Sequence, residues 1–190
     1  MQILAFNGSP RKKGNTSSLI AAILEGARSK GAVTTEVRLH DIDMKGCMGC
    51  LSCRTDIGKC KQKDDLSPYL EKIKSATGVV IGCPIYMYRI SGQMKLLVDR
   101  MYSLYANLPQ GGYKSMVPAG KTYALVVSQG ADNADLYQKS IRYLAGMTGS
   151  GLGMKEVGRI VHVDSHQQPA QRNKNLMDFA FTLGTKMLEI

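Results

Sequence analysis

Segments of two kinds alternate along this chain. Five short segments with the pattern of β-strands are each followed, directly or after a loop, by a segment whose apolar residues recur at helical spacing. The predicted strands are residues 2–6, 33–39, 79–82, 122–127 and 156–163, and the predicted helices are residues 16–28, 66–75, 91–105, 135–145 and 169–188. This alternation predicts an α/β fold, a doubly wound five-stranded parallel sheet of order 2-1-3-4-5 with helices on both faces.

The length of 190 residues predicts a single domain, 1–190, with a cysteine-containing loop inserted at 47–60. The longest apolar stretch, 77–85, is too short to cross a bilayer, and the N-terminal basic residues follow the apolar run, unlike a secretory signal. We therefore expect a cytoplasmic protein with no membrane partner. The net charge is +10, but the basic residues are dispersed, which favours a solvated basic surface over a nucleic-acid site.

A polar and cationic loop joins the first predicted strand to the first predicted helix. It reads GSPRKKGNTSS over residues 8–18. Free amides and the dipole at the start of a helix attract anions, so this loop is predicted to bind a phosphate group. The mononucleotide motif GxxxxGK[ST] is absent because Asn15 follows Gly14, and GxGxxG does not follow this strand. Helix capping alone would account for one hydroxyl of the loop, but not for three together with Arg11.

The loop after the third predicted strand is the second candidate for ligand binding. Open parallel sheets bind ligands beyond the carboxyl ends of their strands, at the switch point between strands one and three. The sequence CPIYMYR at 83–89 offers aromatic and apolar side chains that can hold a flat heterocycle. Alternatively, Tyr86 and Tyr88 are partly buried surface aromatics that bind no ligand. Cys83 is expected to be a buried apolar residue, and no role is assigned to His40, His162 or His166.

The two loops together resemble a known family. GSPRKKGNTS after the first strand and PIYMYRISGQMKLLVDR after the third are similar to the flavodoxin-like NADPH-dependent FMN reductases, and the resemblance extends over essentially the whole chain. It implies FMN as cofactor and NAD(P)H as a donor. It implies a phosphate site made of Ser9, Arg11, Asn15, Thr16 and Ser17. It implies a ring site made of Pro84, Ile85, Tyr86, Met87 and Tyr88, closed on the other rim by Ser128, Gln129 and Gly130.

Four of the five cysteines are concentrated in one short segment, at Cys47, Cys50, Cys53 and Cys60. In a reducing compartment such crowding indicates a metal or redox site rather than structural disulfides. Three cysteines at every third position match the way bacterial ferredoxins present thiolates to a [4Fe–4S] cluster, although the last gap is longer here and Lys61 stands where Pro is usual. Zinc, free thiols and a dithiol–disulfide switch remain alternatives.

The position of this motif after the second strand is similar to that in the iron–sulfur flavoproteins. That resemblance implies that Cys47, Cys50, Cys53 and Cys60 hold a [4Fe–4S] cluster. Glycines at 46, 49 and 58 would let the backbone turn around it, and the cations at 54, 59 and 61 would offset its negative charge.

Three functions follow as hypotheses. The first is an FMN-binding oxidoreductase of the iron–sulfur flavoprotein type, which transfers electrons between ferredoxin or NAD(P)H and a small acceptor and needs no catalytic acid from the protein. The second is a cluster-free NAD(P)H-dependent FMN or quinone reductase. The third is a nonenzymatic flavin-dependent binding module. The resemblance also implies a homodimer or homotetramer, and the predicted loop at 106–120 is expected to form an assembly surface or a wall of the active site.

Overall fold

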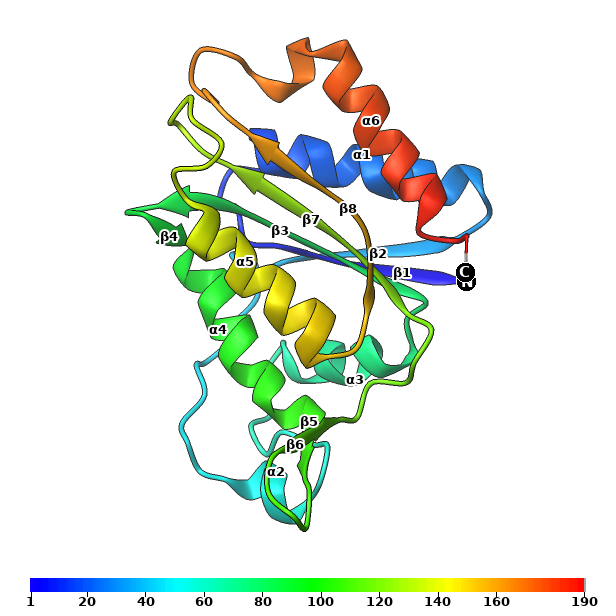
Figure 1. Ribbon diagram of the computed structural model, residues 1–190, viewed down its shortest axis with the longest axis vertical. Helices are drawn as coiled ribbons and strands as arrows, with labels where there is room; N and C mark the ends of the chain where they lie inside the picture. Colours follow the sequence, from blue (N-terminus) through cyan, green and yellow to red (C-terminus); the bar gives the residue numbers. More distant parts are fainter. Residues whose placement is uncertain (190) are drawn as a thin grey trace.

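The computed structural model describes residues 1–189, and its centre is a parallel sheet between two layers of helices (Figure 1). The strand order is β2-β1-β3-β7-β8, which confirms the predicted order 2-1-3-4-5. The bounds of these strands are β1 Gln2–Asn7, β2 Val33–Arg38, β3 Gly78–Tyr86, β7 Thr122–Ser128 and β8 Lys155–His162. All neighbouring pairs in this order run parallel, so the carboxyl ends of the five strands share one edge of the sheet.

The helices cover both faces of the sheet, as predicted (Figure 1). One face carries α1 (Asn15–Ser29) and α6 (Lys174–Lys186), and the other carries α3 (Ser67–Ser75), α4 (Gly92–Arg100) and α5 (Gln138–Gly146). A single short helix, α2 (Ser52–Thr55), lies within the cysteine loop, and a π-helical turn at Met147–Gly151 follows α5. Among residues 1–189, every helix is too short or too polar to traverse a bilayer.

The sheet separates two apolar cores. Leu4 and Phe6 of β1 belong to the core under α3, α4 and α5, whereas Ile3 and Ala5 belong to the core under α1 and α6. Successive side chains of a strand point to opposite faces, so one continuous apolar run supplies both cores.

Helix α5 begins at Gln138, three residues after its expected start. Larger local differences from the prediction occur at four other places. Strand β3 extends to Tyr86 and turns back into the two-residue strand β4 (Arg89–Ile90), where a loop was expected. Helix α4 ends at Arg100 and a 3-10 turn, Met101–Leu104, replaces its expected last turn. The expected loop at 106–120 contains most of a small antiparallel hairpin, β5 (Tyr105–Asn107) with β6 (Tyr113–Ser115).

The fourth difference concerns the C-terminal helix, which was expected to start at residue 169. A 3-10 turn, Ala170–Arg172, comes first, and α6 begins at Lys174. Asn173 sets this start because its side-chain oxygen accepts a hydrogen bond from the amide of Leu176 at 3.0 Å. Asparagine is a strong N-cap residue, so a helix starts after it in preference to running through it.

Candidate functional site

A cavity of about 110 Å³ lies at the carboxyl ends of β1, β3 and β7. It is therefore at the switch point of the sheet, where doubly wound folds bind ligands. The polar loop after β1, the end of β3 and the end of β7 all contribute to its wall, and so does the loop after β8. The lining residues that were predicted from the sequence are Ser9, Arg11, Asn15, Thr16, Pro84, Ile85, Tyr86, Ser128 and Gly130.

The start of α1 faces this cavity without a side-chain cap. Gly14 is the N-cap residue, and no acidic residue occupies the first turn. The first amides of a helix have no partner inside the helix, and the dipole makes this end positive. A phosphate at this place would accept hydrogen bonds from those amides and from the side chains of Arg11 and Thr16. The residues present therefore fit the phosphate end of a mononucleotide.

Ser17 and Asn15 have structural partners within the site. The hydroxyl of Ser17 donates to the carbonyl oxygen of Arg11 at 2.7 Å and accepts from the side-chain amide of Asn7 at 2.9 Å. Asn15 donates to the carbonyl oxygen of Ser165 at 2.8 Å and accepts from the amide of Ala170 at 2.8 Å. Ser17 thus fixes the shape of the loop, and Asn15 ties the loop after β8 to the start of α1.

Two residues of the wall, Ser165 and His166, were not predicted. Both belong to the loop after β8, and His166, which was given no role from the sequence, packs so close to Gly130 that a Cβ atom at Gly130 would lie 3.0 Å from the imidazole Cδ2. The predicted parallel sheet could have indicated these two residues, because its fifth strand ends at the same edge as the first. Gln129 is buried and donates to the carbonyl oxygens of Ala131 and Asn133, and it does not line the cavity.

The predicted ring loop divides into two parts. Pro84, Ile85 and Tyr86 line the cavity, whereas Met87 and Tyr88 form the turn between β3 and β4. Both turn residues have left-handed backbone conformations, with φ of 45° and 67°, as a tight two-residue hairpin requires. The Met87 side chain is 88% exposed, and the Tyr88 ring packs edge-on against Tyr137 with centroids 5.7 Å apart.

A second cavity, of about 30 Å³, is lined by all four clustered cysteines. Cys47 and Cys50 are exposed, and Cys53 and Cys60 are half-buried. Hydrogen bonds from the backbone and side chain of Ser52 lower the pKa of the Cys50 thiol. The fifth cysteine, Cys83, is buried in the core as predicted, and burial raises its pKa to about 12.

Two arginines donate to sulfur atoms of this cysteine cavity. Arg54 donates from Nη2 to Cys53 Sγ at 3.6 Å, and its guanidinium stacks on the ring of Tyr102, with Cζ 4.1 Å from the centroid. Arg100, on α4, donates from Nε to Cys60 Sγ at 3.1 Å. The sequence predicted Arg54 as a neighbour of the thiols but not Arg100, which lies 40 residues from Cys60 in the chain.

The cysteine cavity has the donor set of an iron–sulfur cluster. Within residues 1–189, no three Cys, His, Asp or Glu side chains converge on one point as ligands of a single metal ion. A [4Fe–4S] cluster takes one thiolate at each of four separate irons, so it needs four thiols around a space. The four thiols around one cavity fit that requirement in number and in kind.

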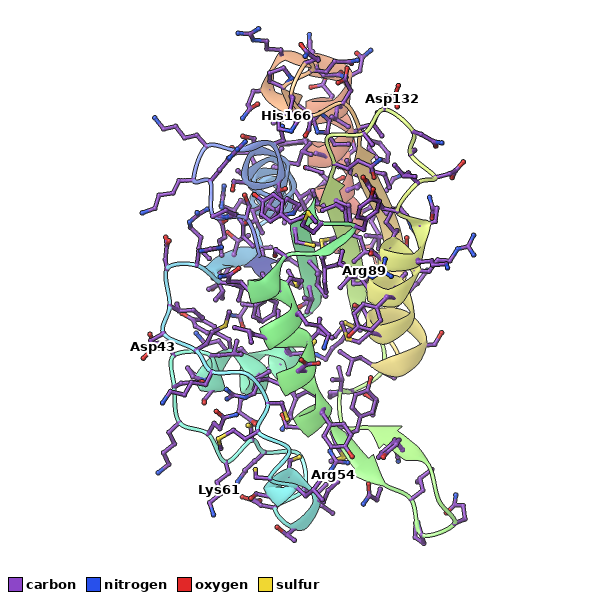
Figure 2. All side chains as sticks on the ribbon, turned by 90° about the vertical axis from the view of Figure 1, so that its left-hand side faces the viewer. Asp43, Arg54, Lys61, Arg89, Asp132 and His166 are labelled. Atoms are coloured by element: carbon purple, nitrogen blue, oxygen red, sulfur yellow. The ribbon has the colours of Figure 1, made fainter. Side chains whose placement is uncertain are left out.

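The two candidate sites are separate and share no lining residue. Figure 2 shows His166, from the wall of the first cavity, near one end of the long axis, and Arg54 and Lys61, from the cysteine loop, near the other.

A sheet of order β2-β1-β3-β7-β8 with a cavity at its switch point defines a flavodoxin-like α/β protein. The same fold is found in a solved FMN-dependent NADH-azoreductase from Bacillus anthracis in complex with FMN, with a TM-score of 0.72, 15% identity and coverage of 97% of this chain and 98% of that one. The chain belongs to the NADPH-dependent FMN reductase family, whose model matches residues 1–168.

Curated relatives resemble the chain more closely in sequence. An iron–sulfur flavoprotein from Archaeoglobus fulgidus is 38% identical over 133 residues, which are 70% of this chain and 61% of the relative. Another from Methanocaldococcus jannaschii is 37% identical over 100 residues, 53% of this chain and 51% of the relative. The aligned part of the chain thus corresponds to between 51% and 61% of the length of these relatives.

Proposed function

We propose that this protein is an FMN-dependent oxidoreductase of the iron–sulfur flavoprotein type. The observation that carries the proposal is the coexistence of two sites in one chain: a cavity at the switch point of a flavodoxin-like sheet, and a second cavity lined by four thiols. The similarity to iron–sulfur flavoproteins supports the same assignment.

In the first cavity, the protein would bind and orient FMN. The amides at the start of α1, with Arg11 and Thr16, would hold the phosphate, and Pro84, Ile85 and Tyr86 would contact the ring. FMN, when bound, supplies the ability to accept two electrons as hydride and to release them singly. Ser128 supports the site from β7, since its hydroxyl accepts a hydrogen bond from that of Thr16 at 3.1 Å.

In the second cavity, Cys47, Cys50, Cys53 and Cys60 would ligate a [4Fe–4S] cluster, which would supply one-electron transfer. The electron donor is proposed to be ferredoxin or NAD(P)H and the acceptor a small molecule. A homodimer or homotetramer in the cytoplasm is proposed as the working form.

The test is the cofactor content of protein purified without oxygen. We expect flavin and iron with acid-labile sulfide in the wild type. Cys50→Ser should lower the iron and sulfide content several-fold and leave the flavin content unchanged, because the two cavities are separate. Cys83→Ala is the matched control, since Cys83 is a cysteine of the core that lies outside the cysteine cavity.

Each outcome bears on one part of the proposal. Wild-type protein with flavin but without iron or sulfide after reconstitution would identify a cluster-free reductase. Colourless protein that binds DNA in a salt-sensitive manner would refute the oxidoreductase and favour a binding module.

A further inference from the structure

Arg100 has an unusual position for a charged side chain. It is on α4, its side chain is completely buried, and it borders the cysteine cavity. A buried guanidinium is costly unless its charge is paired and its donors are satisfied.

The five N–H donors of Arg100 all have acceptors. Nη1 donates to the Asp64 carboxylate at 2.6 Å and to the carbonyl oxygen of Lys45 at 2.9 Å, and Nη2 donates to Asp64 at 3.2 Å and to the hydroxyl of Ser67 at 3.3 Å. The fifth donor, Nε, has Cys60 Sγ as its partner at 3.1 Å. Four bonds on the fork of the guanidinium therefore fix the direction of the fifth.

The anchors of this fork are themselves held. Asp64 also accepts hydrogen bonds from the amide of Lys45 at 3.1 Å and from the amide and hydroxyl of Ser67 at 3.2 and 3.0 Å. Lys45 precedes the first cysteine of the loop, and Ser67 begins α3 after the last. The Arg100–Asp64 pair therefore fixes both ends of the segment that carries the four cysteines.

The charge of Arg100 is compensated by Asp64, so its effect on Cys60 is local. The Arg100–Asp64 pair carries no net charge, so it has little long-range effect on the sulfur. The Nε–H group acts on Cys60 Sγ through the hydrogen bond alone. A hydrogen bond to a sulfur ligand stabilises the more negative, reduced state of an iron–sulfur cluster and raises its potential.

We propose that Arg100 is a positioning residue that directs a hydrogen bond onto Cys60 and thereby raises the reduction potential of the iron–sulfur cluster. This inference rests on the proposed function, because it requires that the four cysteines hold a cluster. Arg54 would act in the same sense on Cys53 through a longer hydrogen bond.

The test compares wild type with Arg100→Lys, both purified without oxygen. Lysine keeps the positive charge beside Asp64 but has no second nitrogen to donate to Cys60 while its ammonium pairs with the carboxylate. We expect the midpoint potential, titrated by the electron paramagnetic resonance (EPR) signal of the reduced cluster, to fall by about 59 mV, a tenfold change in the one-electron equilibrium. Arg159→Lys is the matched control, because Arg159 also pairs with a carboxylate, Glu156, but lies on β8 away from the cysteine cavity.

The results separate this inference from the function on which it rests. A wild type without iron and sulfide overturns both. Arg100→Lys protein with full iron and sulfide content and an unchanged potential overturns the role of Arg100 and leaves the proposed function standing. A shift of the same size in Arg159→Lys also overturns it, because the effect would then lack a local cause.

A labelling experiment covers the case in which Arg100→Lys does not fold. Arg54→Lys removes the other arginine that donates to a cysteine sulfur. When this variant is grown with ¹⁵N-arginine, Arg100 remains as the labelled arginine whose Nε–H donates to Cys60 Sγ. Pulsed EPR of its reduced cluster should detect a ¹⁵N coupling. Absence of that coupling in a fully loaded cluster would contradict the hydrogen bond.

Discussion

At the scale of single residues, the hydrogen-bond partners of a side chain decide whether it can serve a ligand. The loop after β1 has five predicted phosphate-site residues, but Asn15 and Ser17 use their polar atoms to hold the surrounding chain. Arg11 is exposed and lines the cavity. Thr16 also lines it, and its hydroxyl donates to Ser128, a residue of the same cavity wall rather than of the surrounding chain. These two residues are therefore the ones to change when phosphate binding is tested.

The double variant Arg11→Gln with Thr16→Val should weaken FMN binding. Each side chain lost removes a hydrogen bond to a charged group, for which about 1.5–3 kcal/mol is typical, so the dissociation constant should rise at least tenfold. Flavin fluorescence on titration of the cofactor-free protein measures this. Lys13→Gln serves as control, because Lys13 is a cation of the same loop that does not line the cavity. Equal affinity of the double variant and the control would contradict the phosphate assignment.

At the scale of elements, the contact between α1 and α6 depends on two glycines. A Cβ atom at Gly26 of α1 would lie 1.9 Å from the carbonyl oxygen of Phe181, and a Cβ atom at Gly184 of α6 would lie 1.9 Å from that of Ile23. Both distances are far inside van der Waals contact. The backbones of the two helices can approach this closely only because neither position has a side chain.

Gly26→Ala should therefore lower the free energy of unfolding, by about 2–3 kcal/mol, because a methyl group would force the helices apart. Urea denaturation followed by circular dichroism measures the change. Gly146→Ala provides the contrast, since Gly146 ends α5 with open space around its Cβ position. That variant should be neutral or stabilised by up to about 1 kcal/mol. A Gly26→Ala protein as stable as wild type would show that the two helices can separate without cost.

At the scale of the whole molecule, one ion pair joins the segment that follows the cysteine loop to helix α4. Asp64 lies before α3, Arg100 ends α4, and their 2.6 Å contact is almost completely buried, with the Asp64 side chain 10% exposed. Burial opposes ionisation of Asp64, but hydrogen bonds from Arg100, the amide of Lys45 and Ser67 outweigh it and lower its pKa from 3.8 to about 2.

This pair should make the free energy of unfolding depend on pH in the acidic range. An Asp whose pKa is lowered by folding stabilises the protein fully above pH 3.8, and that contribution is lost as the pH falls towards 2. Asp64→Asn should cost about 3 kcal/mol at pH 6, because it leaves the buried Arg100 without its counter-ion. The difference from wild type should be about 1 kcal/mol smaller at pH 3.

Urea denaturation at the two pH values measures both differences. Asp178→Asn, a change to an exposed carboxylate on α6, should show neither effect. A cost for Asp64→Asn that is the same at pH 6 and pH 3 would contradict the lowered pKa.

The sequence alone determined the order of strands and helices, the two faces of the sheet and the position of the loop after β1. These features depend on local patterns: period-2 and period-3.6 apolar spacing, and a polar loop directly before a helix. The same local patterns did not predict the two hairpins, β3–β4 and β5–β6. Tyr105 to Ser115 contains no long apolar run, and the turn at Met87 and Tyr88 has none of the glycine or asparagine that such turns usually carry.

Only the tertiary structure decided which residues share a site. His166 and Ser165 join the first cavity because all five parallel strands end at one edge, and Arg100 reaches Cys60 because α4 packs beside the cysteine loop. Asn15 has the composition of a ligand-binding residue, but its amide is bonded to residues 150 and 155 positions away. Apolar periodicity is a property of residues that are neighbours in the sequence. The partners of a polar side chain, in contrast, come from chain segments that only folding brings together.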